Sequence, residues 1–441
     1  MIIKNYSQNI SKRKIFILSV PIFFSNLAVP LTGLIDTGLM GNLGQTKFLA
    51  ATSIATSIMT MVIWSFAFFR MGTVGLVAQL FAKSDYREIA KTLSRNILLA
   101  IVVAAIIILL RPLIVELSKI FFITSKETQD LIKTYISVRV LSVPAELIIY
   151  ILIGFYLGIQ KTKISSLLII MLSTTNIIFS SFFVLTLDLE VFGVALGTLI
   201  ANYLTLIVFI FYTHRFIIKK FQIIPTFQRL IIPSKFLKLI LINFDIFIRT
   251  VALTFSFLWF SYLGSKLGED YLAVNAILIQ FTILASFVLD AYAYSTEGVV
   301  GYTIGKKNIK SFLLVVKNSI QLSLITALII SLAYLFFYKL IINLISNVEI
   351  LRFISYQHII WVIIIPPIAS LCYQMDGIFI GASQTKEIRN AMLVSVASFI
   401  ILSIYFTKYF GNHGLWFSLL IFMALRSLTL NFFFKNILKR F

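Results

Sequence analysis

The sequence predicts an all-α polytopic membrane protein with twelve transmembrane helices in two six-helix bundles. Hydrophobic residues make up 59% of the 441 residues and charged residues only 12%, which leaves too little polar surface to coat a soluble globule. Apolar runs of about 20 residues recur along the chain, and each is long enough to cross a hydrocarbon layer of about 30 Å. The second half also repeats features of the first, as the two lobes of many transporters do.

The apolar runs define the expected helices. A basic stretch with two prolines, 215–236, follows the sixth run, and no comparable polar linker occurs elsewhere. We therefore expect an N-terminal six-helix lobe at 1–214, a cytoplasmic linker at 215–236 and a C-terminal six-helix lobe at 237–441. The expected helices lie near 15–41, 48–82, 90–112, 129–159, 164–187, 192–214, 237–264, 271–304, 311–342, 354–382, 390–408 and 414–435.

The two halves are related by a constant shift in sequence. An offset of 223 positions aligns FYLGIQKTK (155–163) with IFIGASQTK (378–386), and it also aligns Pro144 with Pro367. Because each half holds an even number of helices, the two bundles share one orientation and are related by a pseudo-two-fold axis along the membrane normal. We expect a central cleft between the bundles, which suits alternating access better than a permanent pore.

The net charge of +21 arises from short Lys and Arg clusters between the apolar runs, and not from one basic stripe with interleaved aromatics. This pattern indicates positive-inside topology and argues against nucleic acid as a partner. We expect both termini in the cytoplasm, an uncleaved first helix and multi-pass insertion into the plasma membrane, the inner membrane of a bacterium. The expected partners are small organic molecules and the lipid bilayer, and the expected state is a monomer.

Asp36 lies in the first long apolar run, where an ionised carboxylate is strongly disfavoured. A charged side chain at that depth costs a few kcal/mol or more unless it is protonated, paired or hydrated. A group that exchanges protons or cations is therefore the first hypothesis for Asp36. The alternative is a carboxylate that is permanently hydrogen-bonded and fastens two helices together.

Other polar residues in the apolar runs fall at helical spacing. Asn176 and Ser180 are four apart and share a face, so they either line an ion site or hydrogen-bond between helices. Asp245 and Arg249 are also four apart, the spacing of a structural ion pair within one helix.

The C-terminal half holds three further intramembrane carboxylates. Asp290 and Glu297 are seven apart and share a helical face, and Asp376 lies in a later run. They are candidates for binding a cation or a cationic substrate, and the alternative is simple pairing with Arg249 or Arg426.

The sequence lacks the motifs of an enzyme. GYTIGKK (301–307) lacks the first glycine and the final Ser or Thr of a phosphate loop, so ATP-driven transport has no support. The three histidines form no HExxH pattern and look isolated, and a single cysteine, Cys372, allows no Cys cluster. We expect no catalytic residue, no metal site and no organic cofactor.

Six stretches resemble one transporter family. The chain looks like a member of the multidrug and toxic compound extrusion (MATE) family, in its DNA-damage-inducible F (DinF) branch. The resemblance lies in PLTGLIDTGLMGNLG (30–44), FFRMGTVGLVAQ (68–79), NFDIFIRT (243–250), LGEDYLAVNAILIQF (267–281), LDAYAYSTEGVVG (289–301) and MDGIFIGASQTKEIRNAML (375–393). It implies twelve helices in two lobes and export of amphipathic, often cationic compounds in exchange for protons or sodium.

The resemblance also implies roles for single residues. Asp36 matches the proton-linked aspartate of the first helix, Pro21 matches the proline where that helix bends, and Asn176 matches a polar partner of the aspartate. Ser180 departs from the pattern, because many relatives carry a second aspartate there. We therefore expect a secondary active antiporter coupled to protons, which need only one carboxylate. The alternatives are sodium-coupled antiport of the same substrates and a lipid-linked precursor flippase of similar two-lobe architecture.

Overall fold

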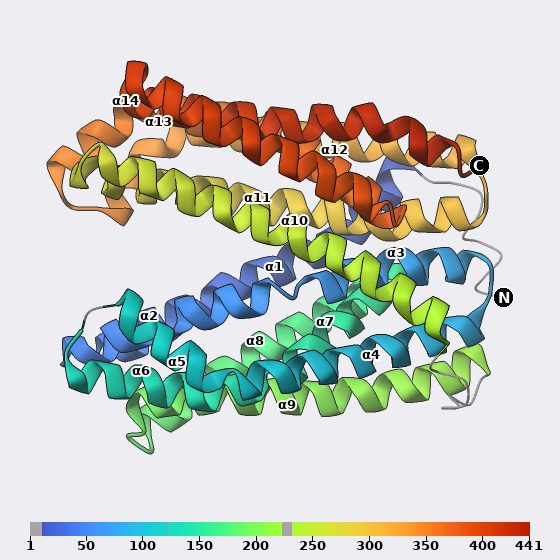
Figure 1. The fold of residues 1–441 in the computed structure, drawn as a ribbon, viewed down its shortest axis with the longest axis horizontal. Helices are drawn as coiled ribbons and strands as arrows, with labels where there is room; N and C mark the ends of the chain where they lie inside the picture. Colours follow the sequence, from blue (N-terminus) through green and yellow to red (C-terminus); the bar gives the residue numbers. More distant parts are fainter. Residues whose placement is uncertain (1–10, 123, 223–231) are drawn as a thin grey trace. The chain divides into compact units, whose positions relative to one another are not determined.

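A computed structural model describes residues 11–122, 124–222 and 232–441 of the chain (Figure 1). Within these ranges the chain forms helices and connecting loops and no β-strand, which confirms the all-α class. Part of the expected linker, 223–231, lies outside the described residues. In chain order the elements are α1 Lys12–Gly41, α2 Thr46–Trp64, α3 Phe68–Ala82, α4 Tyr86–Leu109, α5 Arg111–Phe121, α6 Lys126–Arg139, the 3-10 turn η2 Val140–Ser142, α7 Val143–Gly158, α8 Thr162–Leu185, α9 Glu190–Phe216, the π turn η3 Ile217–Phe221, α10 Pro233–Lys266, α11 Glu269–Gly305, α12 Ile309–Ile345, α13 Glu349–Gly381 and α14 Thr385–Leu438.

The number of spans agrees with the expected twelve. Ten helical segments of the described ranges are long and apolar enough to cross a membrane, with α2 and α3 counted as one and α6 and α7 as another. One of the ten, α14, contains both of the last two expected helices, and α10 supplies a further helix of 34 residues. Each expected transmembrane helix therefore has a counterpart.

Two expected helices are interrupted. The run expected at 48–82 is divided into α2 and α3 by a turn at 65–67, although no Gly or Pro marks it. The run at 129–159 is divided by η2 just before Pro144, which occupies the first turn of α7. A proline is favoured there because its missing N–H would have no partner in the first turn of a helix. The short helix α5 was not expected.

The long element α14 is a helical hairpin. Gly411 has φ 55° and ψ −136°, a conformation that only glycine adopts without strain, and the chain reverses there. The rings of Phe399 and Phe422, on either side of the turn, lie 5.3 Å apart, and Figure 1 shows the two parts of α14 side by side. At the 223 offset Gly411 corresponds to Asp188, which also has a positive φ of 50°.

The repeat extends to the backbone of the turns. Ser84, before α4, has φ 58°, and its counterpart Lys307, before α12, has φ 52°. The next residue in each half caps the following helix. Asp85 accepts a hydrogen bond from the backbone N–H three residues later at 3.1 Å, and Asn308 does the same at 2.9 Å. The offset found in the sequence therefore relates equivalent structures.

Equivalent glycines allow equivalent helices to approach closely. A Cβ on Gly158 of α7 would lie under 3.0 Å from the carbonyl oxygen of Val74 in α3. A Cβ on Gly381 of α13 would collide in the same way with the carbonyl oxygen of Glu297 in α11. Gly158 and Gly381 are 223 positions apart, and so are Val74 and Glu297. The two halves therefore share the same helix-packing geometry.

The chain divides into two compact units. One consists of Phe24–Asn243 and is called the N-terminal unit below. The C-terminal unit consists of Phe244–Phe441 together with the residues through Phe23. The division therefore falls inside α1 and inside α10, whereas the expected lobe boundaries lay in the linker.

Each unit is built around one enclosed helix. In the N-terminal unit α7 is almost fully buried and packs against α3, α4, α8 and α9. In the C-terminal unit α13 packs against α11, α12 and α14. The polar residues discussed next lie on these enclosed helices and on their neighbours.

Candidate functional site

Asp36 is held in the N-terminal unit with one oxygen unsatisfied. Its Oδ1 is inaccessible to solvent and accepts no hydrogen bond from any described residue. The hydroxyl of Ser180 and the guanidinium of Arg139 are the groups that act on the carboxylate. The structure therefore brings Ser180, from α8, to the first-helix aspartate. A buried polar atom without a partner costs about 1–3 kcal/mol, which makes this oxygen a candidate for binding something.

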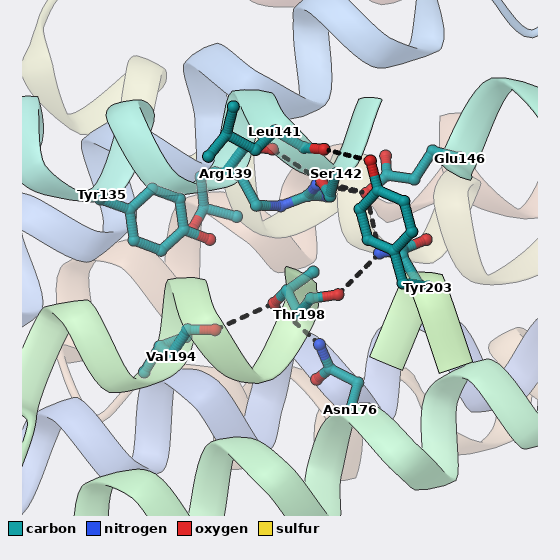
Figure 2. Close-up of polar contacts among 11 residues, drawn as sticks. Tyr135, Arg139, Leu141, Ser142, Glu146, Asn176, Val194, Thr198 and Tyr203 are labelled. Carbon is teal, nitrogen blue, oxygen red and sulfur yellow. Dashed lines mark hydrogen bonds and ion pairs between the residues drawn. The ribbon is translucent and has the colours of Figure 1, made fainter. Parts of the chain in front are cut away.

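Asn176 and Ser180 share a buried face of α8, as their spacing predicted. Asn176 Nδ2 donates to Thr198 Oγ1 of α9 at 2.8 Å, and this hydroxyl donates to the carbonyl oxygen of Val194 at 3.0 Å (Figure 2). Ser180 is 0% exposed, and its Oγ makes no hydrogen bond of ordinary geometry with the described residues. Asn176 thus bonds to α9, and Ser180 stays available to Asp36.

A second carboxylate, Glu146, lies in the same unit. It is 7% exposed, and its Oε1 accepts hydrogen bonds from Arg139 Nη1, from Ser142 Oγ at 3.1 Å and from Asn202 Nδ2 at 3.0 Å. Figure 2 shows Arg139 and Ser142 turned toward Glu146. Arg139 is the last residue of α6 and Glu146 lies in the first turn of α7, so their side chains meet alongside η2, which lies between them.

The hydrogen bonds connect these groups into one network. Asn202 Nδ2 also donates to the carbonyl oxygen of Thr198 at 2.9 Å, which links Glu146 through α9 to Asn176. Asp36 adjoins this network through its interactions with Arg139 and Ser180. We call this set the polar ring; its members are Asp36, Arg139, Glu146, Asn176, Ser180, Thr198 and Asn202.

The polar ring contains several oxygen atoms without a hydrogen-bond partner. Four of its buried oxygens lack a hydrogen bond from the described residues, and they are Asp36 Oδ1, Asn176 Oδ1, Ser180 Oγ and Asn202 Oδ1. An added proton on Asp36 would supply a donor, and a water or a small cation would supply the rest. These oxygens can accept a hydrogen bond from a further donor.

Tyr135 borders the polar ring one turn before Arg139. Its hydroxyl accepts a hydrogen bond from Thr56 Oγ1 of α2 at 3.0 Å. It also interacts electrostatically with Arg139 and with Asp36. The phenol therefore joins α2 and α6 beside the carboxylate.

Pro21 lies inside α1, which is helical from Lys12 to Gly41. A proline in a helix interior removes one backbone hydrogen bond and weakens the helix locally. The boundary between the two units, at Phe23 and Phe24, falls two residues after it. The predicted bending position thus coincides with the point where α1 passes from one unit to the other.

The expected ion pair between Asp245 and Arg249 does not form. Asp245 instead accepts hydrogen bonds from Arg389 Nη1 at 2.6 Å and from Thr385 Oγ1 at 2.9 Å, both on α14. Arg249 pairs with Asp376 of α13. The spacing within α10 was suitable, but partners on neighbouring helices satisfy both charges and also tie α10 to the rest of its unit.

Asp376 is paired on two sides. Arg249 donates to its Oδ2, and Arg426 Nη2 donates to the same oxygen at 2.7 Å. Asp376 is 6% exposed and Arg426 is 2% exposed. The structure therefore agrees with the alternative in which Asp376 pairs with Arg249 and Arg426. Its negative charge is already compensated by these two guanidinium groups and is not available to a cation.

The other two C-terminal candidates lie on α11. Asp290 interacts electrostatically with Cys372 and Tyr373 of α13, close to Asp376 in the sequence. Glu297 is 1% exposed, at the close contact with Gly381. Among the described residues, no three or more His, Cys, Asp or Glu side chains gather in a way that could hold a metal ion.

Sequence reasoning missed several members of the polar ring. Arg139 and Glu146 are seven apart, the same helical-face signal that singled out Asp290 and Glu297. Thr198 and Asn202 are four apart, as Asn176 and Ser180 are. The same spacing, looked for at every polar residue of the apolar runs, identifies both pairs.

Comparison with known proteins agrees with this architecture. The MatE family model matches the chain twice, at residues 21–182 and at 246–407, once in each repeat. DNA damage-inducible protein F of Escherichia coli is 32% identical over 95% of this chain and 91% of its own length. Multidrug export protein MepA of Staphylococcus saprophyticus is 22% identical over 71% of this chain and 68% of its own length.

Solved structures share the fold. A MOP superfamily transporter from Pyrococcus furiosus has a TM-score of 0.88 at 17% identity, and the match covers 97% of this chain and 96% of that chain. An outward-facing multidrug resistance MATE family transporter of the MOP superfamily has a TM-score of 0.88 at 18% identity, with the same coverage. With a family model that spans both repeats and a relative that aligns over nearly its whole length, the chain belongs to the MATE (MatE) family of membrane transporters.

Proposed function

We propose that this protein is a secondary active antiporter that exports amphipathic, often cationic organic compounds in exchange for protons. The single observation that carries the coupling is the unsatisfied, buried carboxylate oxygen of Asp36 within the polar ring. Export of organic compounds is supported by membership of the family and by relatives such as the multidrug export protein MepA.

The surroundings of Asp36 favour a proton over a metal cation. A proton needs one carboxylate, and Asp36 is the carboxylate that Ser180 faces. Proton binding converts Asp36 into a neutral hydrogen-bond donor, and the unpaired oxygens of the polar ring can accept that bond.

Sodium is the second candidate, and one observation favours it. The amide oxygens of Asn176 and Asn202 and the hydroxyl of Ser180 lack hydrogen-bond donors, and oxygen atoms of this kind are ligands for hard cations. Sodium would then bind with Asp36 ionised. The two candidates differ in which cation gradient drives export.

The proposed cycle uses α1 as its moving part. Substrate leaves through an outward-open state, Asp36 takes a proton from the outside, and its neutralisation lets α1 bend near Pro21, where the helix lacks a backbone hydrogen bond. Release of the proton inward resets the site. The gradient drives the cycle because the two states differ in their affinity for the proton.

The setting is the plasma membrane of a bacterium, with both termini in the cytoplasm. The distribution of Lys and Arg between alternate connections supports this orientation. The coupling ion is the only cofactor in the proposal. The working form is proposed to be a monomer, because each unit has its own enclosed core helix and the polar ring is built from one chain.

Substrate-driven pH change in proteoliposomes, with and without sodium, tests the function. Asp36→Asn is expected to abolish proton-driven export of an organic cation such as ethidium while the variant still inserts and folds. Glu116→Gln is the matched control, because this substitution also removes one negative charge. The side chain of Glu116 lies on α5 and is exposed. Full proton-driven export by Asp36→Asn would overturn the assignment.

The alternative function with a different class of substrate is that of a lipid-linked precursor flippase. Vesicles that contain a fluorescent lipid carrier, assayed beside vesicles loaded with the organic cation, separate the two. Movement of the organic cation alone supports the proposal. Movement of the lipid alone contradicts it.

A further inference from the structure

The first helix of each repeat begins in the unit formed mainly by the other repeat. The start of α1 belongs to the C-terminal unit through Phe23, and the start of α10 belongs to the N-terminal unit through Asn243. Phe244, where α10 changes unit, corresponds at the 223 offset to Pro21, less than one helical turn before α1 changes unit. The two helices therefore change unit at equivalent positions.

A serine pair fastens the start of α1 to α11 inside the C-terminal unit. The hydroxyl groups of Ser19 and Ser295 share a hydrogen bond of 2.8 Å. Each of the two residues is only 3% exposed. The contact thus joins the first helix of the first repeat to a helix of the second repeat.

The equivalent positions meet again inside the N-terminal unit. Gly72 of α3 corresponds to Ser295, and Ile242 of α10 corresponds to Ser19. A Cβ on Gly72 would lie 3.5 Å from Ile242 Cγ2, and it would collide with the side-chain oxygen of Asn243. The start of α10 therefore packs closely against α3, as the start of α1 packs against α11.

The serine contact can open without leaving a hydroxyl group unsatisfied. Ser19 Oγ lies 2.9 Å from the carbonyl oxygen of Ile15, and Ser295 Oγ lies 2.9 Å from that of Tyr292. Each hydroxyl can therefore donate to its own helix after the two helices separate. Loss of a buried partner is the main cost of breaking a hydrogen bond, so this bond is suited to repeated opening.

The contact of α10 also gains a hydrogen bond when it opens. Asn243 is 3% exposed, and its Nδ2 is buried without an acceptor among the described residues. Water that enters on separation would supply that acceptor. The close packing against Gly72 is thus offset by an unsatisfied donor, which keeps the closed contact reversible.

An ion pair adds to the closed contact of α10. Lys235 Nζ lies 2.9 Å from Glu88 Oε1 in the first turn of α4, within the N-terminal unit. The counterpart of Glu88 in the second repeat is Ser311, which has no carboxylate to offer. The Lys235 side chain is 47% exposed, so this pair contributes little energy and breaks readily.

We infer that the Ser19–Ser295 contact and the packing of Asn243 on Gly72 are the two halves of a cytoplasmic gate, which is closed in this structure. The inference rests on the proposed function and orientation, in which α1 and α10 both begin at the cytoplasmic face. It adds that α10 moves together with α1, and that both contacts must separate before a substrate enters from the cytoplasm.

Cysteine cross-linking tests the gate in the full-length protein. The lone cysteine is first removed as Cys372→Ala. Ser19→Cys with Ser295→Cys, and separately Gly72→Cys with Asn243→Cys, then place two thiols at each contact. A disulfide joins Cβ atoms about 4 Å apart, which suits side chains that already touch. Ethidium export into or out of proteoliposomes is measured after oxidation and again after reduction.

The control pair lies one residue along α11. Thr296 Oγ1 donates to Gln374 Oε1 of α13 at 3.1 Å, inside the C-terminal unit. This contact belongs to the packing around the enclosed helix α13, which is not expected to separate. Thr296→Cys with Gln374→Cys should therefore cross-link and still export ethidium.

Each gate pair is expected to lose export by about tenfold or more when oxidised, and to recover it on reduction, because a cross-link prevents a conformational step that every cycle needs. If the Gly72 pair fails to fold, the serine pair alone decides. Undiminished export by fully cross-linked protein, failure of the serine pair to cross-link, or an equal loss in the control pair overturns the gate and leaves the role of Asp36 intact. Absence of ethidium export by the unmodified protein overturns the proposed function and the gate together.

Discussion

Trp259 occupies in the second repeat the position that Asp36 occupies in the first. The two residues are separated by the 223 offset, and Trp259 Nε1 donates a hydrogen bond at 3.0 Å to Ser403 Oγ. Ser403 is in turn the counterpart of Ser180, the residue that acts on Asp36. The same pair of helix positions therefore meets in both repeats, with an ionisable aspartate in one pair and two neutral side chains in the other.

Trp259→Phe is expected to leave proton-driven export unchanged. The substitution removes one hydrogen bond in the C-terminal unit and should lower the free energy of unfolding by about 1 kcal/mol. The measurements are ethidium export under a pH gradient and the thermal midpoint in detergent. Loss of coupling in this variant, with normal helical content, would show that the second repeat also contributes to proton exchange.

The helices could be predicted because membrane insertion imposes one simple requirement on each of them, a long apolar run. The repeat was visible for a related reason, since the glycines that allow close approach, such as Gly158 and Gly381, cannot be replaced without a clash. The turn at 65–67 was missed because Ser65, Phe66 and Ala67 include no helix breaker.

Side-chain partners were predicted less well, because they depend on which helices meet. Asp245 and Arg249 have suitable spacing along α10, but each pairs with a residue on another helix. His358 and His413 looked isolated in the sequence, and their rings stack 4.1 Å apart where α13 meets the hairpin of α14. Contacts across such sequence separations leave no periodic signal.

The polar ring was predicted less well than the helices and better than the ion pairs. Asp36, Asn176 and Ser180 were found because polar residues stand out in apolar runs, and the structure brings Ser180 to Asp36. That Asn202 bonds Glu146 across 56 positions could not be predicted from spacing, because it depends on the packing of α9 against η2 and α7.

Asp376→Asn should be strongly destabilising. The substitution removes the carboxylate that pairs with both Arg249 and Arg426 and leaves two buried guanidinium groups uncompensated. Breaking a buried ion pair from one side costs about 3–5 kcal/mol. The thermal midpoint and the yield of monodisperse protein measure the effect, and Asp188→Asn, at an exposed turn, is the control. A stability equal to that of the control would contradict the pairing role of Asp376.

The two glycine contacts predict matched effects of alanine. Gly158→Ala and Gly381→Ala each insert a methyl group against a carbonyl oxygen of the facing helix, so each should cost about 1–3 kcal/mol. Gly33→Ala is the control, because nothing lies within 4 Å of a Cβ at that helical position and alanine favours the helix by up to about 1 kcal/mol. Thermal unfolding of the three variants provides the comparison. Equal stability of all three would exclude the close approach.

Double-mutant cycles test how the charges of α10 are partnered. Asp245→Asn combined with Arg389→Gln should show a coupling energy of about 0.5–3 kcal/mol, because the two side chains share a hydrogen bond of 2.6 Å. Asp245→Asn combined with Arg249→Gln should show a smaller coupling, because Arg249 directs its charge to Asp376. Thermal unfolding of the single and double variants gives both energies under the same conditions. A larger coupling energy for Asp245 and Arg249 would show that these two residues form the ion pair within α10 that the residue spacing suggested. It would also show that Arg389 contributes little to the charge interaction of Asp245.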